Sequence, residues 1–259
     1  MRPRASAAPP VAAAVGTATA RERVLERLCG LFDSLAARPG VDDIVPDFLR
    51  FHRELLAARA EGNADRFETA LARLYCVIHG SGGAYAESER RDFDALGGYW
   101  CHAGGLEPLH LIAPFVGPGT RLADYGAGNG FQGLLLQHLY PHRLTTLVEL
   151  GGPMIEQGRR LQALLEIPPG SVEWVHASIM DVPPRRFDVI YLYRPVRPEG
   201  AGRAFYEMFA REVSRAGHPV TIVSVADCLK DFLPAAFRVV HDDGQVTVFV
   251  GGGDGRGPA

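Results

Sequence analysis

The stretch "LADYGAGNGFQGLLLQ", residues 122–137, decides the fold because it joins an apolar run, a glycine-rich turn and a helical pattern. The apolar run ends at Asp124, and Gly126, Gly128 and Gly130 follow within five positions. Glycines let a loop turn tightly and approach a ligand closely, because no Cβ stands in the way. A strand, such a turn and a helix form the first unit of an open α/β sheet, where ligands bind outside the strand ends. Two ligands compete for this loop: the pyrophosphate of a dinucleotide and a small cationic molecule.

The sequence on both sides of this stretch predicts an α/β fold. Buried strands are expected at 121–126, 144–150, 172–178, 187–193 and 219–225, and helices at 105–116, 131–140, 152–167, 200–217 and 228–237. Continuous apolar strands that alternate with helices are typical of a parallel sheet covered on both faces. The runs in 237–250 alternate and are joined by Asp-Asp-Gly, which indicates a hairpin. We expect a doubly wound, seven-stranded, mostly parallel sheet with a terminal antiparallel hairpin.

The N-terminal part of the chain has helical periodicity and no strand pattern. Helices are expected at 20–37, 45–62, 63–80 and in 84–100. This divides the chain into a disordered tail (1–20), a helical cap or lid (21–103), an α/β domain (104–250) and a flexible tail (251–259). The first twenty residues carry two arginines and many alanines, but Pro9 and Pro10 interrupt any signal-peptide core.

Composition narrows the classes of partner. The formal net charge is −3, and Lys and Arg are scattered, so we expect neither nucleic acid nor a membrane as a partner. No apolar run approaches the ~18–20 residues that cross a bilayer. The four cysteines form no C-x-x-C pair and the histidines are dispersed, so we expect reduced thiols, no metal and a cytoplasmic protein. The oligomeric state is not indicated.

Two carboxylates favour the cationic ligand. Gly128, Gly130 and Gly133 satisfy G-x-G-x-x-G, but a single match of this kind is weak evidence for a dinucleotide. Asp124 at the strand end would repel a pyrophosphate and attract an ammonium or sulfonium. Glu149 ends the next strand, where a carboxylate can accept both hydroxyls of a ribose. The pair therefore predicts a nucleoside that carries a positive charge.

Residues 104–250 resemble the class I S-adenosylmethionine-dependent methyltransferase family. The family's first motif is an acid, one residue, then G-x-G-x-G, and Asp124, Gly126, Gly128 and Gly130 match it in register. The resemblance implies S-adenosylmethionine as cofactor, with the loop around its methionine half and the acid of the second strand on its ribose. The residues expected there are Asp124, Gly126, Ala127, Gly128, Asn129, Glu149 and Leu150.

The family's adenine site is matched only in part. A Gly-Asp pair often follows the third strand in the family, and here Ala177-Ser178 takes its place. Ser178 can still form a hydrogen bond and the Ile179 backbone can contact the adenine edge, while Asp181 is an alternative carboxylate. Family members often lay the segment before the first helix of the domain over the cofactor. In this chain Tyr99, Trp100 and His102 belong to that segment.

The fourth strand departs from the family pattern. Many N-methyltransferases carry Asn/Asp-Pro-Pro-Tyr after it, whereas this chain reads "YLYRPVRP". Tyr191 and Tyr193 are two residues apart on a strand, so they share one face, where aromatic rings can stabilise a sulfonium or orient a substrate. His102 is the candidate general base. Arg194 is a candidate partner for a substrate carboxylate. The stretches that offer metal ligands in other members supply only Asp227.

These patterns predict a methyltransferase that acts on a small metabolite. The helical part is expected to form a lid that encloses this substrate at the strand ends. An alternative keeps the cofactor and changes the reaction, to transfer of its aminocarboxypropyl group or its cyclisation, with release of methylthioadenosine. A cofactor-binding protein without catalysis and an NAD-linked oxidoreductase are the remaining hypotheses.

Overall fold

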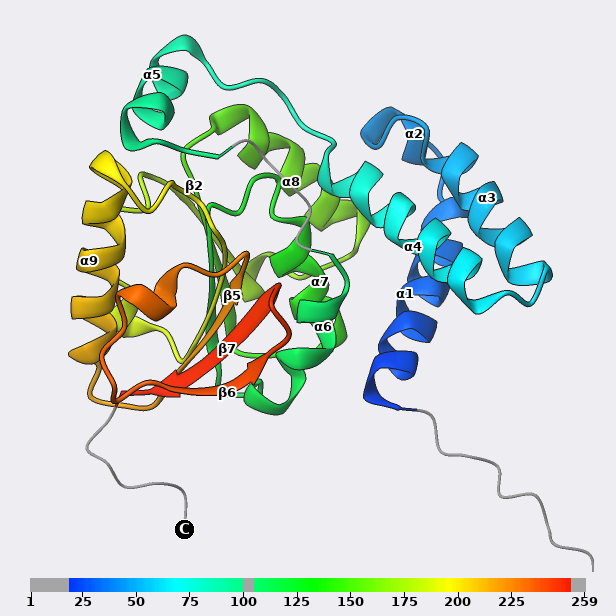
Figure 1. The fold of residues 1–259 in the computed structure, drawn as a ribbon. Coiled ribbons are helices and arrows are strands. Elements are labelled where there is room, and N and C mark those ends of the chain that lie inside the picture. Colours follow the sequence, from blue (N-terminus) through cyan, green and yellow to red (C-terminus); the bar gives the residue numbers. More distant parts are fainter. Residues whose placement is uncertain (1–18, 100–104, 253–259) are drawn as a thin grey trace, which may run out of the picture.

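A computed structural model describes residues 19–99 and 105–252 (Figure 1). Within residues 19–99, the N-terminal part holds five helices: α1 (Ala20–Ala36), α2 (Val41–Ile44), α3 (Phe48–Ala60), α4 (Ala64–His79) and α5 (Glu87–Leu96). Local sequence explains where two of them begin. Thr19 and Glu22 form a capping box at the start of α1, and the Asn63 side chain accepts the Arg66 N–H at the start of α4.

The α/β part contains one seven-stranded sheet in the order β3-β2-β1-β4-β5-β7-β6. Its strands are β1 (Arg121–Tyr125), β2 (Leu144–Glu149), β3 (Val172–His176), β4 (Val189–Tyr193), β5 (Val220–Val225), β6 (Arg238–Asp242) and β7 (Val246–Gly251). The first five are parallel, and β7 lies antiparallel between β5 and β6. The winding reverses between β1 and β4, which places a ligand-binding crevice there. The predicted fold class is confirmed.

Helices cover both faces of the sheet (Figure 1). α7 (Phe131–Leu139) and α8 (Gly152–Leu164) pack on one face with α6 (Glu107–Leu111), and α9 (Gly200–Ser214) packs on the other. Successive side chains of β4 point to opposite faces of the sheet. Val189 and Tyr191 belong to the core on the α7 side, and Ile190 and Leu192 belong to the core under α9. The α7-side core also contains apolar side chains of α1, α3 and α4, so the helical part shares it.

Several predicted helices are shorter in the structure. The helix expected at 45–62 begins at Phe48, because Asp47 has a left-handed backbone with a φ of 67°, which a right-handed helix does not contain. The helix expected at 105–116 ends at Leu111, and a 3₁₀ turn that contains Pro114 follows. Within 228–237 only the 3₁₀ turn Leu229–Asp231 forms.

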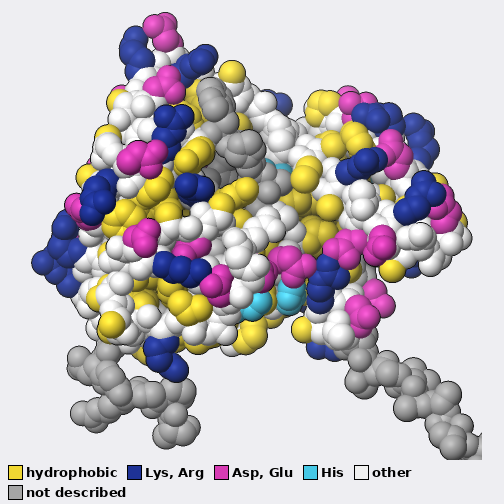
Figure 2. Space-filling view, in the orientation of Figure 1, with side chains coloured by type: hydrophobic (Ala, Val, Ile, Leu, Met, Phe, Trp, Pro, Cys, Tyr) yellow, Lys and Arg dark blue, Asp and Glu magenta, His cyan; other side chains and the backbone are white. Residues whose placement is uncertain are grey.

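Among the described residues, no helix is both long enough and apolar enough to cross a membrane. On the face shown in Figure 2, acidic and basic side chains are intermixed.

Candidate active site

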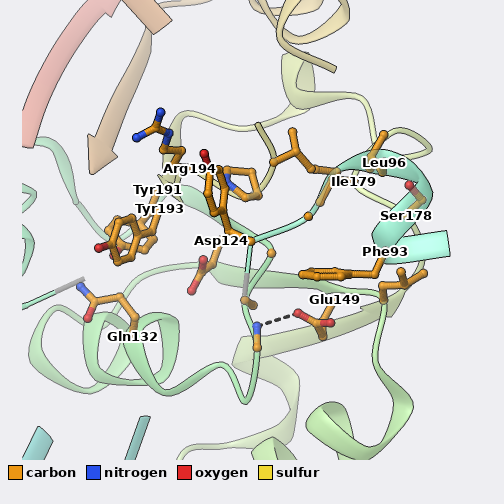
Figure 3. A pocket seen from close by; sticks show the side chains of 18 of the residues that line it. Phe93, Leu96, Asp124, Gln132, Glu149, Ser178, Ile179, Tyr191, Tyr193 and Arg194 are labelled. Atoms are coloured by element: carbon orange, nitrogen blue, oxygen red, sulfur yellow. Dashed lines mark hydrogen bonds between the residues drawn. The ribbon is translucent and has the colours of Figure 1, made fainter. Parts of the chain in front are cut away.

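A cavity of about 240 Å³ opens at the carboxyl ends of β1, β2 and β4, where the winding reverses. Most side chains predicted from the sequence meet in its wall (Figure 3). These are Tyr99, Asp124, Gly126, Ala127, Gly128, Glu149, Leu150, Ser178, Ile179, Tyr191 and Tyr193.

The glycine loop adopts a left-handed backbone conformation that is unfavourable for residues with a Cβ. Gly126, Gly128 and Gly130 all have positive φ, between 59° and 76°. The N–H groups of Gly126 and Ala127 both donate to the Val148 carbonyl of β2 at 3.0 Å, which holds the loop over the strand ends. The loop therefore presents backbone rather than side chains to the cavity.

Asp124 is a buried carboxyl at the end of β1, with 2% of its surface exposed. Burial raises its pKa to about 7, the charge of Glu149 adds to the shift, and a hydrogen bond from the Gly133 backbone opposes it. No described Lys or Arg forms a salt bridge with it. A cation in the cavity would favour its ionised form.

Glu149 is the second buried carboxyl, at the end of β2. Its Oε2 accepts the Gly128 N–H at 2.7 Å, the contact dashed in Figure 3. Its Oε1 accepts the Gly151 N–H at 2.7 Å and the Tyr85 hydroxyl at 3.1 Å. Burial raises the pKa of Glu149, and these hydrogen bonds oppose the rise. The carboxylate is thereby fixed in orientation toward the loop and the cavity.

The end of β4 forms the opposite side of the cavity. Tyr191 and Tyr193 point the same way from the strand, as predicted, and both pack in the core on the α7 side. Arg194 follows with a φ of 31°, and its neighbour at the end of β5, Ala226, has a φ of 50°. Such conformations are costly for residues other than glycine and cluster at functional sites. The guanidinium of Arg194 lies over the ring of Tyr99 at 5.3 Å.

Residues 79–99, which we call the closing segment, complete the cavity wall. The Tyr85 ring stacks on Phe93 with centroids 5.2 Å apart. Glu89 accepts the Gly152 N–H at the start of α8, at 2.8 Å. Gly98 forms a bridge with Val196, and the Tyr99 N–H donates to the Pro195 carbonyl at 3.1 Å. Both ends of α5 are thus tied to the α/β part beside the cavity.

Two predicted site residues are not in the described cavity wall. The Asn129 side chain turns away from the cavity, and its amide donates to the carbonyls of Ile78 at 2.8 Å and Ser81 at 2.6 Å. It holds the glycine loop against the closing segment. His102, like Trp100, lies outside the described residues. Asp181, the alternative adenine ligand, is exposed and does not line the cavity.

The cavity wall also contains residues that the sequence did not indicate, from the closing segment, from α7 and from the loops after β4 and β5. His79, Tyr85, Phe93 and Leu96 line the cavity, and nothing in their local pattern indicates it. Gln132 also lines it. The sequence does contain a signal for Gln132, because it is a polar residue two positions after Gly130 in an otherwise apolar helix start.

Comparison with known proteins adds likeness of fold only. No protein-family model and no curated protein matches the sequence. TrmN from Thermus thermophilus aligns over 56% of this chain and 46% of its own, with 21% identity and a TM-score of 0.42. An RNA methyltransferase from Salinibacter ruber in complex with S-adenosyl-L-homocysteine aligns over 59% and 92%, with 16% identity and a TM-score of 0.45. A protein of the NADB-Rossmann superfamily from Streptococcus agalactiae aligns over 57% and 69%, with 14% identity and a TM-score of 0.41.

The chain spans less than half of TrmN. The strand order and the antiparallel β7 are those of the Rossmann-like fold of class I S-adenosylmethionine-dependent methyltransferases, as the glycine motif predicted. One prediction is wrong: net charge does not exclude nucleic acid as a partner, since an RNA methyltransferase is among the proteins with this fold. The net charge of a whole chain does not describe the local surface that a partner contacts.

Proposed function

We propose that this protein is an S-adenosylmethionine-dependent methyltransferase whose methyl acceptor is a small molecule. The observation that carries the proposal is the pair of buried carboxyls, Asp124 and Glu149, at the ends of adjacent strands beneath the glycine loop. Their pKa values are raised because burial leaves their negative charge poorly compensated. A cationic nucleoside would compensate it, whereas the phosphates of a dinucleotide would add to the repulsion.

The residues present fit this cofactor. Glu149 offers carboxylate oxygens to ribose hydroxyls, and Ile179 and Leu96 supply apolar surface for a base on the same side of the cavity (Figure 3). Leu150 also lines the cavity. The loop Gly126–Gly128 presents backbone to the methionine half. When bound, S-adenosylmethionine supplies a methyl group activated by its sulfonium.

The chain's own contribution is then alignment and exclusion of water. The closing segment and the β4 end surround the cavity, so a bound acceptor would be held away from bulk solvent. Tyr191 and Tyr193 would orient the acceptor and place aromatic rings near the positive charge. Alignment of reactants within contact distance supplies much of the catalysis in such transfers.

Calorimetric titration tests the cofactor. We expect S-adenosylmethionine and S-adenosylhomocysteine to bind and NAD not to bind. Glu149→Gln is expected to weaken binding about tenfold, or about 1.4 kcal/mol. Glu156→Gln, an exposed carboxylate on α8, is the control and should bind as the wild type does. Binding of NAD alone would refute the assignment.

Incubation with methyl-labelled S-adenosylmethionine and a cell extract tests the reaction. The proposal expects S-adenosylhomocysteine and label in the low-molecular-weight fraction. Label in the RNA or protein fraction would contradict a small acceptor. Release of methylthioadenosine would instead support transfer of the aminocarboxypropyl group or cyclisation of the cofactor.

A further inference from the structure

Gln132 is a buried amide whose oxygen is hydrogen-bonded and whose nitrogen has no partner in the described part of the chain. It lies in the first turn of α7 with 1% of its surface exposed, and it lines the cavity. Its Oε1 accepts the hydroxyl of Tyr75 at 2.6 Å. Its Nε2 is buried and has no hydrogen-bond partner among the described residues. Because buried polar groups in proteins are almost always paired, this donor indicates a ligand.

Tyr75 fixes the direction of that donor. The phenol is fully buried and packs against the rings of Phe131 at 5.6 Å and His79 at 5.8 Å. Because it donates to Oε1, the amide is held with Nε2 on the other side. In Figure 3 that nitrogen is directed toward the side of the cavity where Tyr191 and Tyr193 lie.

The charges around this donor favour an uncharged ligand atom. Burial lowers the pKa of His79 to about 4, so its ring is neutral at pH 7. The carboxyl of Asp124 faces the same side of the cavity, and the guanidinium of Arg194 points away from it (Figure 3). A carboxylate placed against Gln132 would meet the carboxyl of Asp124 with no described basic side chain directed toward it, whereas a carbonyl oxygen meets no such repulsion.

We infer that Gln132, together with Tyr191 and Tyr193, forms the acceptor-substrate subsite, and that it takes an uncharged, ring-bearing molecule whose carbonyl oxygen accepts the Nε2 hydrogen bond. The inference rests on the proposed function, because it assigns the Glu149 end of the cavity to the nucleoside. Gln132 is then a specificity-determining residue: a site built to form a hydrogen bond rejects an analogue that lacks it.

Two probes of the same shape test the subsite. Acetophenone carries a carbonyl where α-methylstyrene carries a methylene group. Each is titrated into full-length protein saturated with S-adenosylhomocysteine, with ligand-observed NMR as the readout. The wild type should bind acetophenone about tenfold more tightly than α-methylstyrene, and benzoate more weakly than acetophenone.

Variants separate recognition from folding. Gln132→Met should bring the affinity ratio of the two probes to about one, and should change S-adenosylhomocysteine affinity less than about twofold. Gln137→Met is the matched control, because Gln137 lies on the same helix, bonds to Thr145 and His142, and does not line the cavity. It should keep the ratio of the wild type.

Several results would overturn the inference. Equal affinities for the two probes, no measurable binding of acetophenone, or tighter binding of benzoate would each refute the subsite as described. A Gln132→Met variant that keeps the ratio but loses S-adenosylhomocysteine affinity would assign Gln132 to the cofactor. If the wild type fails to bind S-adenosylhomocysteine, the proposed function fails, and the same probes titrated without it still report on Gln132.

Discussion

Asp124 concentrates the chemistry of the site in one side chain. Its carboxyl is buried at the end of β1, and the described residues give it a backbone N–H but no basic partner. In the folded protein the negative charge of Asp124 is therefore unfavourable, and it lies where the proposed cofactor carries a positive charge. Two measurements follow from its raised pKa, one on binding and one on stability.

The affinity for S-adenosylmethionine should rise with pH. With a pKa of about 7, Asp124 is mostly protonated at pH 6 and mostly ionised at pH 8. A cationic ligand favours the ionised form, so we expect about tenfold tighter binding at pH 8 than at pH 6. Calorimetry in two buffers of different ionisation enthalpy should detect the released proton. Asp124→Asn corrects for titration of the ligand itself, and an equal pH dependence in that variant would contradict the prediction.

The stability of the unliganded protein should fall with rising pH, whereas the affinity for S-adenosylmethionine should increase. The pKa of Asp124 is about 7 in the folded protein against an ordinary 3.8, so the folded state holds a proton that the unfolded state has lost between these values. The free energy of unfolding therefore falls as pH rises from about 4 to about 7. Asp124→Asn should remove this loss and be more stable than the wild type at pH 8, by on the order of 2–4 kcal/mol. Urea denaturation at pH 5 and pH 8 measures it, and a variant that is less stable at pH 8 would refute the pKa assignment.

At the scale of elements, close packing between α8 and β3 supports the loop. Gly158 of α8 faces Trp174 of β3 and the backbone of Asn129. A Cβ at this position would overlap the Trp174 ring and lie 2.6 Å from the Asn129 carbonyl oxygen. The position of α8 therefore sets the position of the glycine loop.

Gly158→Ala should destabilise the protein and displace the loop. Overpacking of a filled core costs about 1–3 kcal/mol, and we also expect weaker binding of S-adenosylhomocysteine. Gly30→Ala in α1 is the control, because its Cβ would meet nothing within 4 Å. Replacement of an exposed helical glycine should stabilise by about 0.5–1 kcal/mol and leave affinity unchanged. Chemical denaturation and titration measure both, and equal stability changes in the two variants would contradict the packing argument.

The elements that local sequence patterns define could be predicted from the sequence. The strands, the glycine loop and the hairpin were predictable because their periodicity and turn residues are local. Glu149 followed from its place at the end of a parallel strand, and Ser178 followed from the resemblance to the methyltransferase family. Tyr85 and Phe93 were not predictable, because only the tertiary path of the closing segment brings them to the cavity. The short helix α2 was missed because four residues are too few to show a period.

At the scale of the whole molecule, the helical and α/β parts form one structure. Their apolar side chains share a core, and Tyr75 of α4 contacts both Phe131 and Gln132 of α7. Asn129 then joins the glycine loop to the end of α4. We expect the two parts to unfold together and the ligand to stabilise both.

Asn129→Ala should weaken ligand binding although its side chain does not line the cavity. It removes the buried hydrogen bonds to Ile78 and Ser81 and the acceptor of the Phe131 N–H at the start of α7, which together should cost about 1–3 kcal/mol of stability. Hydrogen exchange in residues 79–99 should speed up, and S-adenosylhomocysteine affinity should fall several-fold.

Asn63→Ala is the matched control. It removes the N-cap of α4 at a comparable cost, about 0.5–2 kcal/mol, away from the cavity. Its affinity should stay that of the wild type. If the two variants lose the same affinity, the loss reflects general destabilisation and not the tie between the two parts.

The Tyr85 hydroxyl already donates to Glu149, the carboxylate assigned to a ribose. A ribose hydroxyl that binds Oε1 in place of Tyr85 would exchange one hydroxyl for another instead of adding a new bond, whereas Oε2 accepts only the Gly128 N–H among the described residues. The Tyr85 hydroxyl thus competes with the ribose hydroxyl for Oε1. The net binding free energy gained at this oxygen is the difference between two similar hydrogen bonds. If the ribose takes the place of the phenol at Oε1, stopped-flow binding should show an association rate that saturates at high ligand concentration, and Tyr85→Phe should remove the plateau.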